Sequence, residues 1–204
     1  DYSEWHAELD AWKKELAKVR NPKDGVVDPA AFVRTLSEKM EDDGVYVADV
    51  GQNQIWSCNY YVMKQGHFLT SGGMGTMGYS IPAAMGAKAA DKNKQVIAVC
   101  GDGSFQMSMM ELATMRQHNM PVKVVVMVNH YLGMVRQYQH FTYDDRYSGV
   151  SLDGSPNLEK IASAYDMPYI RLENMENMEE KIEEFLSIDG AAFMECVIDE
   201  FDLV

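Results

Sequence analysis

The chain has 204 residues, and 47% of them are hydrophobic, so it has the size and composition of one folded domain rather than of a disordered segment. It carries 31 acidic residues against 18 basic ones, a formal net charge of −13. This charge disfavours a nucleic-acid-binding or membrane-binding surface, since both need a basic face, and we expect neither partner.

The cysteines and the apolar segments indicate the compartment. Cys58, Cys100 and Cys196 lie far apart and form no CxxC pair. We therefore expect reduced thiols in a cytoplasmic protein, not a zinc site or a disulfide framework. No apolar run approaches the roughly 20 residues of a membrane span. The charged opening "DYSEWHAELD" does not have the pattern of a signal peptide.

The first residues are predicted to form an amphipathic helix. Its apolar stripe, at alternating steps of four and three, consists of Trp5, Leu9, Trp12, Leu16 and Val19. Such a stripe fits a helix packed on its own domain, and it also fits a helix that faces a partner surface. Because the chain begins with Asp1 and not with methionine, we expect the numbering to start within a longer polypeptide.

Helices and strands are then predicted to alternate. Asp28-Pro29 is a helix start signal, for a helix to about Met40. Further helices are predicted up to Ala90, from Ser104 to about Asn119, from Ser155-Pro156, and over residues 178–186. Strands are predicted over residues 45–51, 95–100 and 122–128 and in "YIRLEN" and "AAFMECVID".

The predicted helix that begins at Ser104 would bury one face. That face consists of Phe105, Met109, Leu112 and Ala113. The strand that follows, "VKVVVMV", is almost wholly apolar, as in a parallel sheet covered on both sides. The whole pattern predicts an α/β fold, a doubly wound, mostly parallel sheet with helices on both faces.

Polar side chains follow two of these strands. Asp102 lies between two glycines directly after strand 95–100, and Asn129 directly follows strand 122–128. The two strands and the helix between them form one βαβ unit, so both strands end at the same edge of the sheet. In open α/β folds this edge binds ligands. We expect Asp102 and Asn129 to lie close together there.

Oxygen donors of this kind suit Mg²⁺ or Ca²⁺, and Mg²⁺ usually shares its coordination shell with ligand phosphate. Glycine-flanked backbone N–H groups and a helix that starts at Ser104 favour the same anion. The turn therefore predicts a site for a metal ion and a diphosphate. A simpler alternative is an Asp-Gly turn with a capping serine, which the matching Asn129 disfavours.

Longer stretches carry a resemblance to a known family. They are "VGQNQIW", "TSGGMGTMGYSIPAAMGAK", "GDGSFQMSMMELATMRQHNMPVKVVVMVN" and "YLGMVRQYQ". They resemble the C-terminal domain of acetolactate synthase (acetohydroxyacid synthase) catalytic subunits, which are thiamine diphosphate-dependent enzymes. The resemblance covers nearly the whole chain. It implies a linker helix over residues 1–25, the thiamine diphosphate-binding fold over residues 26–204, and a fragment of a longer enzyme.

The resemblance also implies roles for the matching residues. Asp102 and Asn129 would ligate Mg²⁺ through their side chains, and Tyr131 through its main-chain carbonyl. Gly75 would accept a hydrogen bond from the cofactor's aminopyrimidine, and Met77 would bend the cofactor into its V shape. Donors to the diphosphate are expected at Gly51, Gln52, Asn53, Gly103, Ser104, Gly133 and Met134.

Two residues depart from the family pattern. Asn53 stands where the family usually has histidine, which puts a phosphate contact of this side chain in doubt. Tyr138 stands where the family usually has tryptophan, an aromatic residue associated with the choice of 2-ketobutyrate over pyruvate as second substrate. We therefore expect Tyr138 to affect substrate selectivity.

The implied activity is the decarboxylation of pyruvate, followed by condensation of the hydroxyethyl carbanion with a second 2-keto acid in branched-chain amino acid biosynthesis. The glutamate that activates the cofactor is expected in an N-terminal domain absent from this chain, so the chain alone is predicted to be inactive. FAD would bind mainly outside it. The full-length enzyme is expected to be a homodimer or homotetramer, either alone or with a regulatory small subunit.

Other functions remain open at this point. Another thiamine diphosphate-dependent carboligase or decarboxylase would share the motif. Residues 73–78 also satisfy GxGxxG, which by itself is weak evidence for a dinucleotide-binding module. A non-catalytic interaction domain is the third alternative, with the stripe of the first helix as its partner surface.

Overall fold

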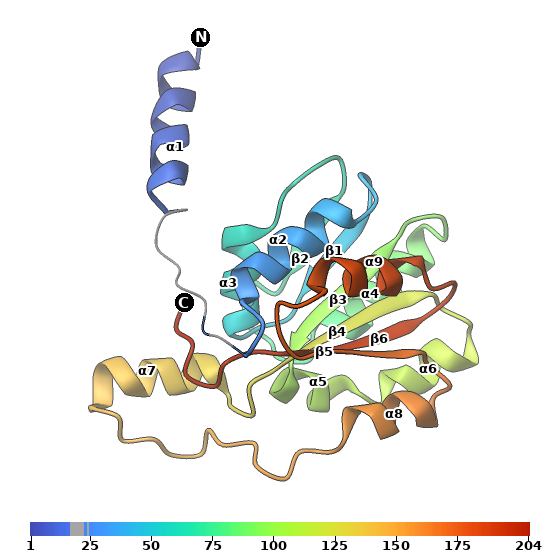
Figure 1. Cartoon of the computed structure of the whole chain (residues 1–204). Helices are drawn as coiled ribbons and strands as arrows, with labels where there is room; N and C mark the ends of the chain where they lie inside the picture. Colours follow the sequence, from blue (N-terminus) through green and yellow to red (C-terminus); the bar gives the residue numbers. More distant parts are fainter. Residues whose placement is uncertain (17–22, 24) are drawn as a thin grey trace.

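A computed structural model describes residues 1–16, 23 and 25–204 (Figure 1). Its centre is a six-stranded sheet in the order β2-β1-β3-β4-β6-β5, and every pair of neighbouring strands is parallel. The strands are β1 (Val45–Ala48), β2 (His67–Thr70), β3 (Val96–Gly101), β4 (Val122–Val128), β5 (Tyr169–Leu172) and β6 (Ala192–Val197). The predicted α/β fold with a parallel sheet is confirmed.

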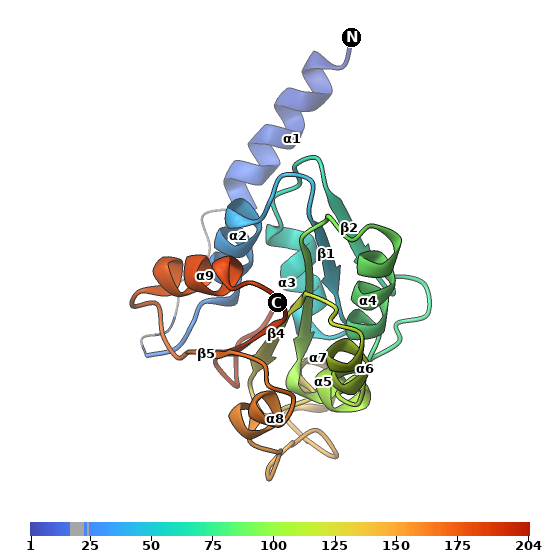
Figure 2. The same cartoon turned by 90° about the vertical axis from the view of Figure 1, so that its right-hand side faces the viewer.

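Helices cover both faces of the sheet (Figure 2). One face packs against α2 (Pro29–Lys39), α3 (Gln52–Tyr60) and α9 (Met178–Ser187). The other packs against α4 (Ser80–Ala90), α5 (Asp102–Ser108), α6 (Glu111–Gln117) and α8 (Leu158–Ala164). All seven residues of β4 are buried, which explains why its sequence is apolar without alternation except at Lys123.

The helix predicted from Ser104 differs from the structure. Two short helices stand in its place, and α5 starts at Asp102, with Gly101 as its N-cap. Ser104 is the third residue of the helix; its Oγ accepts from the Gly101 N–H and donates to the Gly101 carbonyl, each at 3.1 Å. Because the helix is broken around residues 109–110, Met115 is buried and Ala113 is exposed, contrary to the predicted face.

Two helices begin without a capping side chain and were not predicted. The first is α3, whose N-cap is Gly51, and the second is α7 (Gly133–Tyr143), whose N-cap is Leu132. In neither does the N-cap side chain form a hydrogen bond to the helix. The start of α8 was misplaced by two residues, because Asn157 and not Ser155 caps it.

The first helix, α1 (Ser3–Leu16), is predicted correctly as a helix. Trp5 and Trp12 contact each other edge to face at 5.6 Å, and their exposed fractions are 50% and 45%. These two rings are therefore not buried against the domain, contrary to the first alternative for the stripe. Val19 lies outside the described residues. Within the described part of the chain, no helix is long and apolar enough to cross a membrane.

A lysine lies inside the sheet layer. Lys123 of β4 is only 5% exposed, and its ammonium group donates to the carbonyl oxygens of Ile188 and Gly190. Burial lowers the pKa of Lys123 from 10.5 to about 8, and Asp189 opposes this shift. Between these two pH values the unfolded chain holds a proton at this lysine that the folded chain releases. The contribution of Lys123 to stability therefore rises with pH across that interval.

We predict that Lys123→Met removes this contribution. We compare the free energy of unfolding of the unsubstituted chain with that of the variant. The first minus the second should increase as the pH rises from about 8 to about 10.5. Urea unfolding at several pH values measures this difference. A difference that stays flat or falls over the interval would show that the ammonium group is not destabilised by its burial.

Candidate functional site

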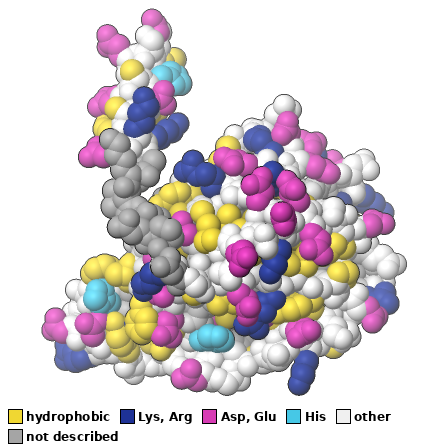
Figure 3. Space-filling model, viewed as in Figure 1, with side chains coloured by type: hydrophobic (Ala, Val, Ile, Leu, Met, Phe, Trp, Pro, Cys, Tyr) yellow, Lys and Arg dark blue, Asp and Glu magenta, His cyan; other side chains and the backbone are white. Residues whose placement is uncertain are grey.

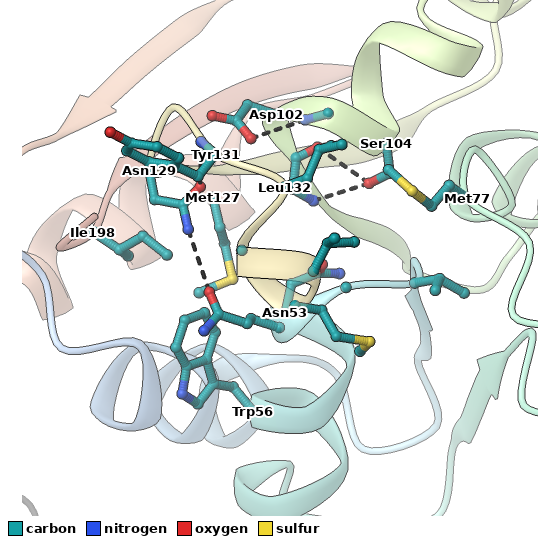
Figure 4. A pocket seen from close by; sticks show the side chains of 18 of the residues that line it. Asn53, Trp56, Met77, Asp102, Ser104, Met127, Asn129, Tyr131, Leu132 and Ile198 are labelled. Atoms are coloured by element: carbon teal, nitrogen blue, oxygen red, sulfur yellow. Dashed lines mark hydrogen bonds between the residues drawn. The ribbon is translucent and has the colours of Figure 1, made fainter. Parts of the chain in front are cut away.

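The predicted site residues gather around one cavity. It has a volume of about 250 Å³ and lies where β1, β3 and β4 end (Figure 4). Twelve predicted residues line it: Gly51, Gln52, Asn53, Gly75, Met77, Asp102, Gly103, Ser104, Asn129, Tyr131, Gly133 and Met134. Tyr138 of α7 is not part of the lining, and its side chain is 58% exposed.

Asp102 joins the end of β3 to the loop that follows β4. Its carboxylate accepts from the N–H of Gly103 at 2.8 Å and from the N–H of His130 at 2.7 Å. His130 has a positive φ of 59°, and in this conformation its N–H reaches Asp102. Burial raises the pKa of the Asp102 carboxyl, and these two hydrogen bonds oppose the rise.

Asn129 begins that same loop. Its Oδ1 accepts from the N–H of Tyr131 at 3.1 Å, and its Nδ2 donates to Gln52 Oε1 at 3.3 Å. The loop is held from outside by residues 150–152, through hydrogen bonds from Leu132 N to Val150 O and from Leu152 N to His130 O. Asp102 and Asn129 therefore lie on one cavity, as expected, and their role as metal ligands stays a prediction.

The donors at this edge suit a hard cation. Asp102 offers a carboxylate, Asn129 a carboxamide, and residues such as Tyr131 main-chain carbonyls, all of them oxygen ligands that Mg²⁺ accepts. Among the described residues, no group of three or more His, Cys, Asp or Glu side chains could hold a metal ion. A soft-metal centre is therefore not found in that part of the chain, and a site with a single carboxylate leaves room for ligand phosphate.

Gln52 connects three parts of the site. Its Nε2 donates to Gln137 Oε1 at 2.9 Å and to the carbonyl of Asp202 at 2.8 Å. Its Oε1 accepts from Asn129, as described above. The side chain thus joins α3, α7 and the C-terminal segment, a role that its position after Gly51 did not indicate.

Asn53 is committed to the wall of the cavity. Its Nδ2 donates to the carbonyl oxygens of Asp49, at 2.8 Å, and Val99, at 3.4 Å, and the residue is 3% exposed. The side-chain N–H groups are therefore used within the protein. What Asn53 can offer an anion is its main-chain N–H in the first turn of α3, where helix N–H groups lack partners within the helix.

Asp49 is a buried acid that sequence reasoning did not assign. It follows β1, is fully buried, and accepts hydrogen bonds from the N–H groups of Val50, Gly78 and Ser80 at 2.8, 2.9 and 2.7 Å. It thereby fixes the glycine-rich loop that carries Met77. The signal was present in the sequence, because an acid directly follows an apolar strand here just as Asp102 does.

The same contacts argue against a dinucleotide-binding loop at residues 73–78. In a dinucleotide fold, the helix N-terminus after such a loop binds the pyrophosphate. Here α4 begins at Ser80, and the N–H groups of Gly78 and Ser80 already donate to the carboxylate of Asp49. An internal anion therefore takes the position that the pyrophosphate would need.

Apolar side chains complete the cavity. Besides the predicted residues, it is lined by Val50, Trp56, Gly101, Met127, Leu132, Val135 and Ile198. Met77 reaches across it toward α5, since its Cε lies 3.5 Å from the position of a Cβ built on Gly103. The cavity is thus polar at the ends of β3 and β4 and apolar along its walls, which suits an organic ligand with a charged end.

Comparisons with known proteins identify relatives of the domain. The family described as "Thiamine pyrophosphate enzyme, C-terminal TPP binding domain" matches residues 49–196. The acetolactate synthase large subunit of Porphyra purpurea is 36% identical over 197 residues, which are 96% of this chain and 33% of that protein. The acetolactate synthase large subunit of Lactococcus lactis is 36% identical over 205 residues, 100% of this chain and 36% of that protein.

A further relative is the acetolactate synthase isozyme 2 large subunit of Escherichia coli. It is 34% identical over 202 residues, which are 95% of this chain and 37% of that protein. The chain thus spans about a third of the length of the relatives it matches.

Substitution of Gly133 is predicted to be destabilising for steric reasons. A Cβ at this first residue of α7 would lie 2.1 Å from Gln52 Oε1 and 2.9 Å from Asn129 Nδ2. Gly133→Ala must therefore displace Gln52 from its hydrogen bonds, and we expect a loss of about 1–3 kcal/mol in the free energy of unfolding.

Gly86→Ala in α4 is the matched control, because nothing lies within 4 Å of its added Cβ. That variant should gain about 0.5–1 kcal/mol. Equal stabilities of the two variants in urea unfolding would refute the packing argument.

Proposed function

The chain belongs to the thiamine pyrophosphate enzymes, as their C-terminal TPP-binding domain, and from this premise we propose that it forms the diphosphate-binding part of an acetolactate synthase. The names of its relatives support the enzyme class. One observation carries the assignment of the site: twelve residues predicted from the sequence to hold the cofactor and its metal line a single cavity.

Three residues are proposed to hold Mg²⁺. Asp102 and Asn129 would contribute side-chain oxygens, and Tyr131 would contribute its main-chain carbonyl. Their fit to this ion rests on the oxygen donor set and on the fixed loop between β4 and α7. Asp102 is the sole acid among these donors, so it would supply the charge that retains the cation.

Main-chain N–H groups are proposed to hold the diphosphate. The first turns of α3, α5 and α7 all border the cavity, and N–H groups at helix N-termini favour anions. The proposed donors are Gly51, Gln52, Asn53, Gly103, Ser104, Gly133 and Met134. Such donors explain how a chain with a net charge of −13 can bind an anionic cofactor without a lysine in the cavity lining.

The remaining work of the chain is to orient the cofactor and keep water away from it. When bound, the cofactor supplies the electron sink for decarboxylation of a 2-keto acid. Gly75 is proposed to accept a hydrogen bond from its aminopyrimidine, and Met77 to impose its bent shape. Asp49 holds the loop that carries both residues. Trp56, Met127 and Ile198 provide apolar walls.

The proposed reaction joins two 2-keto acids. Pyruvate would lose carbon dioxide, and the remaining two-carbon unit would be added to pyruvate or 2-ketobutyrate on the way to branched-chain amino acids. We further propose a cytoplasmic homodimer or homotetramer with a regulatory small subunit, in which FAD binds mainly outside residues 1–204. Another thiamine diphosphate-dependent carboligase is the second candidate, and a panel of 2-keto acids given to the full-length enzyme would distinguish the two.

Tyr138 is proposed to influence the choice of the second 2-keto acid. It lies on α7, which begins at the cavity, and its ring contacts Tyr143 edge to face at 5.8 Å. Figure 3 shows hydrophobic side chains gathered at the α7 end of the molecule. The exposed members on α7 are Val135, Tyr138, Phe141 and Tyr143. Its place on the same helix as the cavity residues Gly133 and Met134 supports a contact with substrate once that surface is covered.

We predict that Asp102→Ala abolishes Mg²⁺-dependent binding of thiamine diphosphate, because the cation loses its charged ligand. The fold should persist, at a cost of about 1–3 kcal/mol for the two N–H groups left without an acceptor. Titration calorimetry measures binding, and circular dichroism measures folding. The control is Asp153→Ala, an exposed acid outside the cavity lining. Unchanged affinity in Asp102→Ala would refute the metal assignment.

A second prediction concerns turnover. The described residues include the proposed diphosphate site but no acid proposed to activate the pyrimidine, so the purified chain of 204 residues should form no acetolactate from pyruvate. A colorimetric assay for acetoin after acid treatment would detect the product. Acetolactate formed by the purified chain would show that the whole catalytic machinery lies within these residues.

A further inference from the structure

Arg136 is a buried cation next to the proposed metal loop. It lies in the first half of α7 and is 5% exposed. Aromatic rings surround its guanidinium: the central carbon lies 4.1 Å from the ring centroid of Phe201, 4.7 Å from that of Tyr147 and 4.9 Å from that of Tyr131. Its NH1 donates to the carbonyl oxygen of Glu200 at 2.9 Å.

The three rings come from three separate segments. Tyr131 belongs to the loop between Asn129 and α7, Tyr147 to the loop after α7, and Phe201 to the C-terminal segment. The hydroxyl of Tyr147 donates a hydrogen bond to Asp145. The pKa of Asp145 is lowered mainly by its hydrogen bonds with Tyr147 and His140, and the charge of Arg136 lowers it further. Arg136 therefore holds these segments together at one point.

One of these segments carries a proposed metal ligand. The ring of Tyr131 packs against Arg136, while its N–H is bound by Asn129 Oδ1. The Tyr131 carbonyl shares its peptide plane with the Leu132 N–H, which donates to the Val150 carbonyl at 2.8 Å. With the ring, the Tyr131 N–H and this peptide plane all held, the direction of the carbonyl is fixed as well. Asn129 and Arg136 thus hold Tyr131 from two sides, at the residue whose carbonyl was proposed to complete the ion's shell.

We propose that Arg136 is a positioning residue for the metal: by seating the ring of Tyr131 it sets the direction of the carbonyl that Mg²⁺ needs. This proposal rests on the proposed function. Mg²⁺ requires nearly octahedral ligands at short distances, whereas Ca²⁺ accepts longer and less regular ones. A displaced carbonyl therefore weakens Mg²⁺ binding more than Ca²⁺ binding.

The planar guanidinium is the feature that lysine cannot reproduce. The central guanidinium carbon of Arg136 lies over aromatic rings while its NH1 donates to the Glu200 carbonyl, whereas an ammonium group is a point charge on a flexible stem. Arg136→Lys keeps the charge and removes this geometry. Arg136→Met removes both.

The experiment is calorimetric titration of Mg²⁺ and of Ca²⁺ into the chain in the presence of thiamine diphosphate. Arg136→Met is expected to weaken Mg²⁺ binding by about ten- to a hundredfold, the usual effect of losing a residue that orients a metal ligand. Arg136→Lys should restore only part of this loss. In both variants the ratio of Mg²⁺ to Ca²⁺ affinity should fall. The matched control is Arg116→Met, an exposed arginine on α6 that pairs with Asp166 and should leave both affinities unchanged.

Several outcomes would overturn the proposal. Unchanged Mg²⁺ affinity in a folded Arg136→Met or Arg136→Lys variant would reduce Arg136 to a stabilising residue, as would an equal loss for both cations. Should neither variant fold, Tyr131→Leu leaves the other two rings on Arg136 and must show the same selective loss of Mg²⁺ affinity. A wild-type Mg²⁺ to Ca²⁺ ratio in that variant would also refute the proposal. Failure of the unsubstituted chain to bind either cation with the cofactor would instead count against the proposed function.

Discussion

The hydrogen bond from the His130 N–H to the Asp102 carboxylate is the contact on which the site depends. Parallel pairing of β3 with β4 brings the two strand ends to the same edge, but pairing by itself leaves the following loop free to turn away. The carboxylate draws that loop back toward α5. Asn129, Tyr131 and the start of α7 then face the cavity that Asp102 borders. A group proposed to bind a cation therefore also builds the site that receives it.

Asp49 shows that an acid at a strand end can have the opposite use. It is fully buried and its carboxylate accepts three main-chain N–H groups, whereas Asp102 accepts two and borders the cavity. Asp49 uses its carboxylate to hold the glycine-rich loop, whereas the carboxylate of Asp102 also borders the space proposed for a ligand. Their sequence contexts, an acid after an apolar β-branched strand, are alike. What separates the two is that Asp102 borders the cavity, whereas Asp49 is not among the residues that line it.

The parallel sheet could be predicted because β3 and β4 are continuous apolar runs separated by helical segments. The cavity residues could be predicted because the diphosphate motif joins positions that sheet topology places side by side. The starts of α3 and α7 could not, since their N-caps, Gly51 and Leu132, provide no capping side chain. Arg136 could not either, because Phe201, the nearest of its aromatic rings, lies far along the chain and only the fold brings it to the guanidinium.

The C-terminal segment reaches the cavity through Gln52, whose amide donates to the Asp202 carbonyl and accepts from Asn129. Gln137 adds a reciprocal pair of hydrogen bonds with the main chain of Val204. Through these contacts the C-terminal segment and the cavity share the side chain of Gln52. A bound ligand that changes the docking constant of the segment by some factor has its own association constant changed by the same factor when the segment docks. If the bound ligand strengthens docking of the segment, a protein that captured residues 202–204 would weaken ligand binding without entering the cavity.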